Sequence, residues 1–283
     1  MKSTALWRMV REWRYSLPQR VGSAMPAPDI AAVLRLASAL RGRGQAVTIG
    51  YFQSDDTPPD DIVQASCAVA DRIGGAKLDA YLSVKAPPLG FDESRIAGIA
   101  RAAAASGLSI LFDAHAPKDA EPTLALAERL LPEFPGTGVV LPARWPRSIA
   151  DARRFRDTSA RIRVVKGEWP DPHDDRGGGE APYLELVATL AGRSAPVAVA
   201  THRPALAQAA LSLLRDAGTP CELEQLRGLP RHRTSAVARR IGVPVRVYLP
   251  WGPGWWPYAI EQAVARPWLP LWMLRDRIGF ADR

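Results

Sequence analysis

Reactive side chains recur in this chain at points where a short apolar segment gives way to polar residues. Lys85 follows one such segment and Asp113 follows the next, and the pattern continues into the last third of the chain. In chain order these positions hold Lys85, Asp113, Pro142, Arg163 with Lys166, Thr201 with His202, Glu222 or Glu224, and Tyr248. Acids, bases, a hydroxyl, an imidazole and a phenol gathered at one mouth could bind a substrate and move its protons.

Each of these residues also has a simpler interpretation. An aspartate after a strand often only caps the next helix, and His202, which closely precedes Pro204, could be a turn residue. Lys85 and Lys166 could be charges on a solvated rim. The shared position at segment ends favours one common site, and Lys166 could form a Schiff base there if it were desolvated.

The stretch V-P-V-R-V-Y-L-P-W-G-P-G-W-W-P-Y-A-I, residues 243–260, indicates how such groups would be positioned. Alternating β-branched residues predict a strand over 243–249. The prolines and glycines of 250–254 predict an exposed turn, and a helix follows with a proline in its first turn. Tyr248, at the strand end, and Tyr258, in the opening helical turn, are therefore expected to face one pocket.

Seven further apolar segments predict strands, each followed by a helical pattern. These strands cover residues 46–52, 78–85, 108–112, 137–141, 162–165, 197–200 and 220–226. Eight strand–helix units predict an α/β fold, a (β/α)8 TIM-type barrel. A doubly wound open sheet is the alternative, but no G-x-G-x-x-G follows the first strand. We expect an N-terminal helical extension over 1–28 and a barrel over 29–283 that includes a C-terminal helix.

The composition restricts the function classes. The formal net charge is +8, but the arginines are dispersed and no nucleic-acid-binding motif accompanies them, so no nucleic-acid partner is expected. The histidines lack metal-site spacing and no G-x-S-x-G occurs, which argues against a metal centre and a serine nucleophile. Two lone cysteines, no apolar run of about 20 residues and no signal-peptide pattern indicate a cytoplasmic protein.

Both ends of the chain combine tryptophan with arginine, over residues 1–14 and 268–278. That combination suits contact with a membrane surface, which would place the protein at the inner face of a membrane. The alternative is that the C-terminal helix covers the barrel bottom or the pocket. The polar stretch D-P-H-D-D-R-G-G-G, residues 171–179, predicts a mobile loop over the site.

Six ordered motifs carry a resemblance to a known family. They are S-V-K, F-D-A, R-V-V-K-G-E-W, A-T-H, E-L-E-Q-L-R-G and V-R-V-Y-L-P-W-G followed by W-P-Y. In this order they resemble the proline dehydrogenase family, whose members are flavin-binding (β/α)8 barrels that oxidise proline to pyrroline carboxylate. The likeness runs from about residue 30 to residue 267. It implies FAD as the cofactor and a small amine or imino acid as the substrate.

The resemblance also implies roles for matching residues. Residues expected to line the flavin are Arg163, Val165, Lys166 and Gly167. A guanidinium near the reactive flavin nitrogen would favour negative charge on reduction. Thr201 and His202 match a pair that contacts the phosphate and ribose portion of the cofactor. Lys85 and Asp113 match residues of the pocket floor, and Tyr248 and Tyr258 match two tyrosines beside the substrate.

The last helix departs from the family pattern R-R-x-x-E, in which two arginines clamp the substrate carboxylate. This chain has Glu261 and Gln262 at the arginine positions and Ala265 at the glutamate. Glu261 would repel a carboxylate, and such a reversal in a dry pocket costs several kcal/mol of binding. Expected flavin contacts also change, because Pro142, Arg203 and Glu224 replace two glutamines and an asparagine.

Three hypotheses follow from these departures. The first is a flavin-dependent dehydrogenase of an amine or imino acid other than free proline, with Glu261 pairing a cationic amine or Arg203 taking a carboxylate. The second is a proline dehydrogenase with a rearranged clamp. The third is a flavin-free barrel that acts as a binding or accessory protein. The sequence leaves the electron acceptor, a quinone or another carrier, unidentified.

Overall fold

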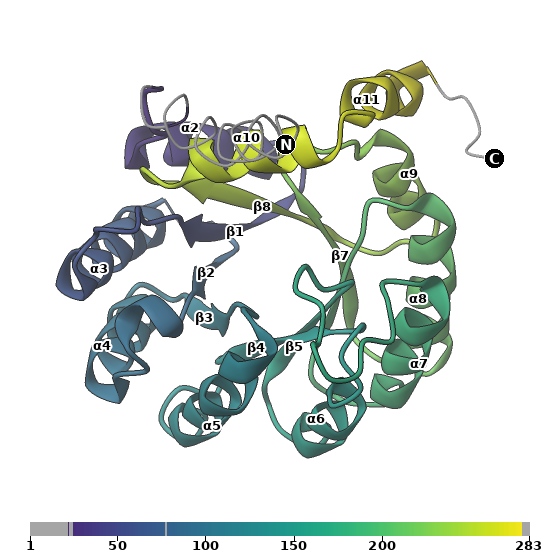
Figure 1. Ribbon diagram of the computed structural model, residues 1–283, viewed down its shortest axis with the longest axis horizontal. Coiled ribbons are helices and arrows are strands. Elements are labelled where there is room, and N and C mark those ends of the chain that lie inside the picture. The colour runs from purple at the N-terminus through teal and green to yellow at the C-terminus, as the bar shows by residue number, and fades with distance from the viewer. Residues whose placement is uncertain (1–21, 23–24, 77, 279–283) are drawn as a thin grey trace, which may run out of the picture.

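The computed structural model describes Gly22, residues 25–76 and residues 78–278. Eight parallel strands close into one barrel in sequence order, and the helices surround it (Figure 1). The strands are β1 Ala46–Tyr51, β2 Ala80–Val84, β3 Ser109–Phe112, β4 Gly138–Pro142, β5 Arg161–Val165, β6 Val197–Ala200, β7 Cys221–Leu226 and β8 Val245–Trp251. The predicted TIM-type barrel is confirmed, whereas the expected N-terminal extension lies almost wholly outside the described residues.

Each strand is followed by a helix, as the sequence pattern predicts. The helices are α2 Ile30–Arg41, α3 Pro59–Gly75, α4 Glu93–Ala105, α5 Ala120–Leu130, α6 Ser148–Phe155, α7 Glu180–Leu190, α8 Pro204–Asp216, α9 His232–Arg240, α10 Trp255–Ala265 and α11 Leu269–Ile278. Two short 3-10 helices, η1 Pro87–Leu89 and η2 Pro117–Asp119, precede α4 and α5. No helix in this part of the chain is long and apolar enough to cross a membrane.

Strand β8 is shifted along the chain by two residues from the predicted range 243–249, because it begins at Val245 and ends at Trp251. It continues through Pro250 to Trp251, and its last two residues pair with β1. Proline in this position is tolerated because it is confined to the end of a strand, where one missing donor interrupts little of the ladder. The turn therefore begins at Gly252, whose φ of 98° favours glycine.

The space between strands and helices is filled mainly with aliphatic side chains and a few aromatic ones, which explains the continuous apolar runs of the strands. The barrel interior is different, because the apolar cluster that the described residues form there is small and consists of Tyr81, Leu111 and Val140, with Ala114 and Val165 packed against it. Below the site, Glu222 accepts hydrogen bonds from Arg161 at 2.6 Å and from Arg246 at 2.9 Å. This paired layer closes the amino-terminal end of the barrel and leaves the carboxyl ends to the site.

Helix α11 is attached to the barrel rim because one of its side chains caps the start of helix α9. The Asp276 carboxylate accepts hydrogen bonds from the backbone N–H groups of Arg231, His232 and Arg233 at 2.8, 2.7 and 3.0 Å. These groups begin α9, where a negative charge is favoured by the helix dipole. The C-terminal helix therefore lies at the carboxyl rim of the barrel and not over its bottom (Figure 1).

Replacing Asp276 with alanine is expected to lower the free energy of unfolding by about 1–3 kcal/mol, because three backbone donors at the start of α9 lose one acceptor. Denaturant titration measures this loss. Asp71→Ala, at an exposed position of α3, is the matched control and is expected to stay within about 0.5 kcal/mol of the parent. Equal stability of the two variants would show that α11 does not cap α9.

Candidate active site

A cavity of about 930 Å³ opens at the carboxyl ends of the strands. Its volume lies near the upper end of the roughly 300–1,000 Å³ range of ligand pockets. The described lining residues that bear on its chemistry are Phe52, Asp55, Asp56, Lys85, Asp113, His115, Pro142, Arg163, Val165, Gly167, Glu168, Trp169, Thr201, His202, Glu224, Tyr248, Tyr258 and Glu261. In (β/α)8 barrels this end of the barrel carries the active site.

Arg163 is the centre of the cavity floor. Its guanidinium donates to Glu224 Oε1 at 2.7 Å and pairs closely with Asp113, while its Nε has no hydrogen-bond partner. Burial alone would favour neutral groups here, but the ion pairs hold the pKa of Asp113 and of Glu224 below the usual range. The three groups therefore remain charged in the barrel interior.

Glu224 is fully enclosed by this network. Besides Arg163, it accepts hydrogen bonds from Thr48 at 2.7 Å and from Tyr81 at 2.6 Å, across the barrel from strands β1 and β2. Only 2% of Glu224 is exposed. The residue that replaces the expected glutamine is thus a partner of Arg163, which the sequence comparison with the family pattern did not reveal.

Lys85 and Tyr248 complete the floor around Asp113. The Tyr248 hydroxyl donates to Asp113 Oδ2 at 3.1 Å, and Lys85 Nζ lies 4.0 Å from the same oxygen. Lys85 also donates to the carbonyl of Tyr51 at 2.7 Å and lies 4.0 Å from the centre of the Phe52 ring. Burial lowers the pKa of Lys85 in spite of Asp113.

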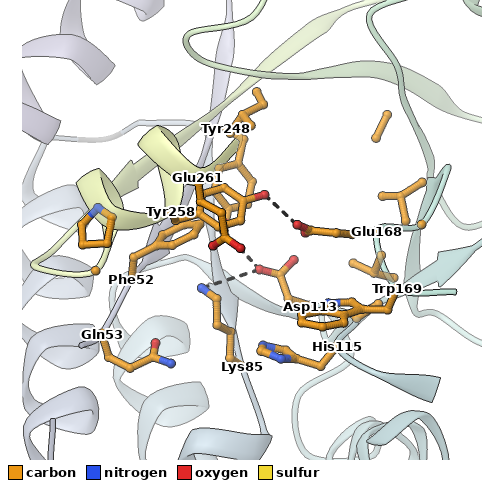
Figure 2. A pocket seen from close by; sticks show the side chains of 18 of the residues that line it. Phe52, Gln53, Lys85, Asp113, His115, Glu168, Trp169, Tyr248, Tyr258 and Glu261 are labelled. Atoms are coloured by element: carbon orange, nitrogen blue, oxygen red, sulfur yellow. Dashed lines mark hydrogen bonds and ion pairs between the residues drawn. The ribbon is translucent and has the colours of Figure 1, made fainter. Parts of the chain in front are cut away.

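Helix α10 and the segment after β5 form the upper walls. Tyr258 and Glu261 project from α10, and Glu168 faces them from the other side (Figure 2). The Tyr258 hydroxyl donates to Glu168 at 3.3 Å, and the Gln262 amide donates to it at 2.6 Å. Burial raises the pKa of Glu168, because its carboxylate is surrounded by protein although it is accessible from the cavity.

Most of the predicted site residues line this cavity. Lys166 and Arg203 are absent from its described lining. Lys166 packs along Gly178, and Arg203 is exposed and paired with Glu180 at 3.0 Å. The exposure of Lys166 gives no support to a desolvated Schiff-base lysine. Sequence reasoning missed Glu168 as a site residue, although it lies within the R-V-V-K-G-E-W motif that was quoted.

His202 has both ring nitrogens engaged by the protein. Its Nε2 accepts from the backbone N–H of Leu226 at 3.1 Å, so Nδ1 carries the proton and donates to the carbonyl of Pro230 at 2.7 Å. Burial lowers the pKa of His202 to about 4. The imidazole is therefore neutral, and it fixes the β7–α9 loop at the rim of the cavity.

This buried histidine predicts an acid-sensitive stability. Because the unfolded pKa is about 6.5, the unfolded chain binds a proton that the folded protein does not bind as pH falls from 6.5 towards 4, so stability is lost across that window, by at most about 3 kcal/mol. His202→Asn should remove this part of the pH dependence of unfolding, and His173→Asn, at an exposed position, should retain it. Identical slopes in both variants would contradict the assignment.

The cavity fits the ring portion of a flavin. The unpartnered Nε of buried Arg163 requires an acceptor, and the ring edge of a flavin offers nitrogen and oxygen acceptors. Val165, Gly167 and Thr201 line the same wall. Gly167 has a φ of 97°, and a Cβ there would meet Pro142 and Arg144 at under 3 Å. Only glycine therefore fits at this position on the edge of the site.

Comparisons with known proteins agree with this geometry. No protein-family model matches the chain. It is 23% identical to proline dehydrogenase 1 of Bacillus subtilis (strain 168), over 84% of each chain, and 20% identical to proline dehydrogenase 2 of the same strain, over 94% of this chain and 92% of that one.

Two solved structures share the fold. Proline utilization A from Bdellovibrio bacteriovorus, inactivated by N-propargylglycine, aligns over 84% of this chain with a TM-score of 0.73 and 16% identity. Proline utilization A from Corynebacterium freiburgense aligns over 94% with a TM-score of 0.71 and 21% identity. The chain spans about a third of these larger proteins, 32% and 33% of their lengths. The chain is therefore similar in sequence to proline dehydrogenases, and it shares the fold of the proline utilization A structures.

Proposed function

We propose that the protein is a flavin-dependent dehydrogenase that removes hydride from the carbon next to the nitrogen of an amine or imino acid, and that its substrate is not free proline. Support for the flavin comes from Arg163, a buried cation that lines the cavity and whose Nε has no hydrogen-bond partner. Support for an altered substrate comes from Glu261, which lines the cavity where the family pattern has an arginine.

FAD would be held along Arg163, Val165, Gly167 and Thr201. When bound, it would accept the hydride, while the nitrogen lone pair of the substrate forms the new C=N bond. The buried positive charge of Arg163 would favour transfer of electrons to the cofactor. Tyr248 would hold Asp113 in place on the floor.

The upper aromatic residues would exclude water from the reacting carbon. The Phe52 ring contacts those of Trp255 and Tyr258, with centroids 5.3 and 5.2 Å apart. Tyr258 joins this cluster to Glu168 on the opposite wall. Helix α10 would therefore act as the lid that seals a bound amine beneath it.

The electrons must then leave to a quinone or another carrier, and α11 supports peripheral membrane contact for that step. Its exposed apolar residues, together with the preceding tryptophan, are Trp268, Leu271, Met273 and Leu274. Arg275 and Arg277 follow in its last turn. Flotation with anionic liposomes should recover the protein with the vesicles, and its absence from them would exclude this contact.

The visible absorption spectrum tests the proposal directly, with FAD added if the purified protein is colourless. We expect a flavin spectrum that bleaches anaerobically with an amine and not with L-proline. Bleaching by L-proline would instead support a proline dehydrogenase with a rearranged clamp. Failure to bind FAD after reconstitution would overturn the dehydrogenase and favour a flavin-free barrel, which Pro142 and the pairing of Arg163 with Glu224 would then explain.

A further inference from the structure

The cavity wall is acidic although the chain as a whole is basic, with a formal charge of +8. The carboxylates on the described wall are Asp55, Asp56, Asp113, Glu168, Glu224 and Glu261. Lys85 and Arg163 are the basic side chains there, since burial lowers the pKa of both His115 and His202. Six carboxylates therefore face two cations across the cavity.

The charges of the floor cancel. Asp113 and Glu224 both pair with Arg163, and Lys85 lies 4.0 Å from Asp113. Two anions and two cations leave no net charge in this layer. The surplus negative charge therefore belongs to the upper wall, where Asp55, Asp56, Glu168 and Glu261 line the cavity.

Glu261 projects from α10 into the cavity, and Glu168 approaches it from the segment after β5 (Figure 2). Within the described chain, neither forms an ion pair with a lysine or arginine. Arg266, which is outside the lining, acts to lower the pKa of Glu168, whereas the negative charge of Glu261 acts to raise it. Glu168 instead relies on the neutral donors Tyr258 and Gln262. A cation inside the cavity would relieve the repulsion between the two carboxylates.

The floor of the cavity holds a buried arginine whose hydrogen-bonding capacity is not fully used. Only 5% of the Arg163 side chain is exposed, and its unpartnered Nε is a buried donor that costs free energy until an acceptor arrives. The cavity therefore has a charge-balanced floor and a surplus of negative charge on its upper wall, which a positive charge would offset. A carboxylate-bearing substrate would place a negative charge between Glu168 and Glu261.

We propose that the substrate is a diamine, with its second ammonium group held between Glu168 and Glu261 where the family pattern places a carboxylate clamp. This inference rests on the proposed function, because it concerns the same site. The Gln262 amide and the Tyr258 hydroxyl keep the Glu168 carboxylate in position for that group. Cation binding there follows charge complementarity rather than cavity size.

A series of five-membered rings that differ in charge tests the proposal at nearly constant size. The probes are cyclopentanecarboxylate, L-proline, L-prolinamide and 2-(aminomethyl)pyrrolidine, and calorimetry on the full chain with FAD added measures each Kd. Affinity is expected to rise through the series, with 2-(aminomethyl)pyrrolidine binding at least tenfold more tightly than L-proline. L-proline binding as tightly as the diamine would overturn the proposal.

Variants of Glu261 locate the effect. Glu261→Gln should weaken 2-(aminomethyl)pyrrolidine about tenfold, and Glu261→Arg should reverse the order in favour of cyclopentanecarboxylate. Glu133→Gln is the matched control, because Glu133 is exposed and pairs with Arg101 on the outer surface. Unchanged affinities in both Glu261 variants, with the unfolding transition intact, would place the cation elsewhere and reject this site.

The proposal and the proposed function fail in different ways. Tight binding of the diamine without bleaching of the flavin would support the diamine site and overturn the dehydrogenase. Bleaching by L-proline, together with preferred binding of L-proline, would support a dehydrogenase and overturn the diamine site. The binding series reports charge preference whether or not turnover occurs.

Discussion

Replacing Arg163 with methionine is expected to lower the free energy of unfolding by about 3–5 kcal/mol, because it leaves buried carboxylates without their cation. Glu224 would keep only Thr48 and Tyr81 as donors, and Asp113 would keep Tyr248 and the more distant Lys85. Equilibrium unfolding in urea measures the loss. The pKa of both carboxylates should rise, so the variant should lose less stability on acidification than the parent.

A second substitution separates the lost charge from lost packing. Glu224→Gln in the Arg163→Met background removes one of the unpaired charges and is expected to recover about 1–3 kcal/mol, as in a double-mutant cycle. Arg161→Met is the matched control two residues earlier on β5, where Glu222 keeps Arg246 as a partner. If Arg161→Met lowers the free energy of unfolding as much as Arg163→Met does, the loss cannot be assigned to the unpaired carboxylates of the cavity floor.

The same variant reports on the chemistry. If Arg163 stabilises negative charge on a reduced flavin, Arg163→Met should slow anaerobic flavin reduction by about 100-fold, the effect of removing one preorganised donor. Stopped-flow absorbance with the preferred amine measures this rate. An unchanged rate in a folded, flavin-loaded variant would remove Arg163 from the assignment.

The fold was predictable because its signals are local. Each strand is a short apolar run of the kind that a sheet covered by helices requires, and the runs recur with the length of a strand–helix unit. The end of β8 was misjudged, since Pro250 and Gly252 are both turn residues in isolation. Pairing with β1, a long-range contact, keeps Pro250 in the strand.

The site was predictable only as a set of strand ends. Arg163 and Val165 face the cavity, but Lys166 follows immediately and lies outside the lining, as the alternation of side chains along a strand would suggest. The pairing of Glu224 with Arg163 joins residues 61 positions apart on different strands. Such a contact depends on barrel closure and register, which no local pattern contains.

Gly50 provides the second large expected effect, because its missing side chain makes room for Tyr248. A Cβ at this position would lie 1.9 Å from the Tyr248 hydroxyl and 2.4 Å from the ring carbon that carries it. The ring cannot simply turn away, since its hydroxyl bonds Asp113 and the Arg163 guanidinium lies 5.2 Å from its centre. Gly50→Ala therefore forces overpacking of the cavity floor.

We expect Gly50→Ala to cost about 1–3 kcal/mol, the usual range for overpacking, and to weaken binding of the preferred amine. Gly98→Ala is the matched control, because a Cβ there meets nothing within 4 Å, and alanine in a helix should stabilise by up to about 1 kcal/mol. Gly50→Ala combined with Tyr248→Leu should cost less than the sum of the two single substitutions, since a shorter side chain frees the space. Additive losses would mean that Tyr248 does not occupy the space beside Gly50, and the position of its hydroxyl on Asp113 would then have to be abandoned.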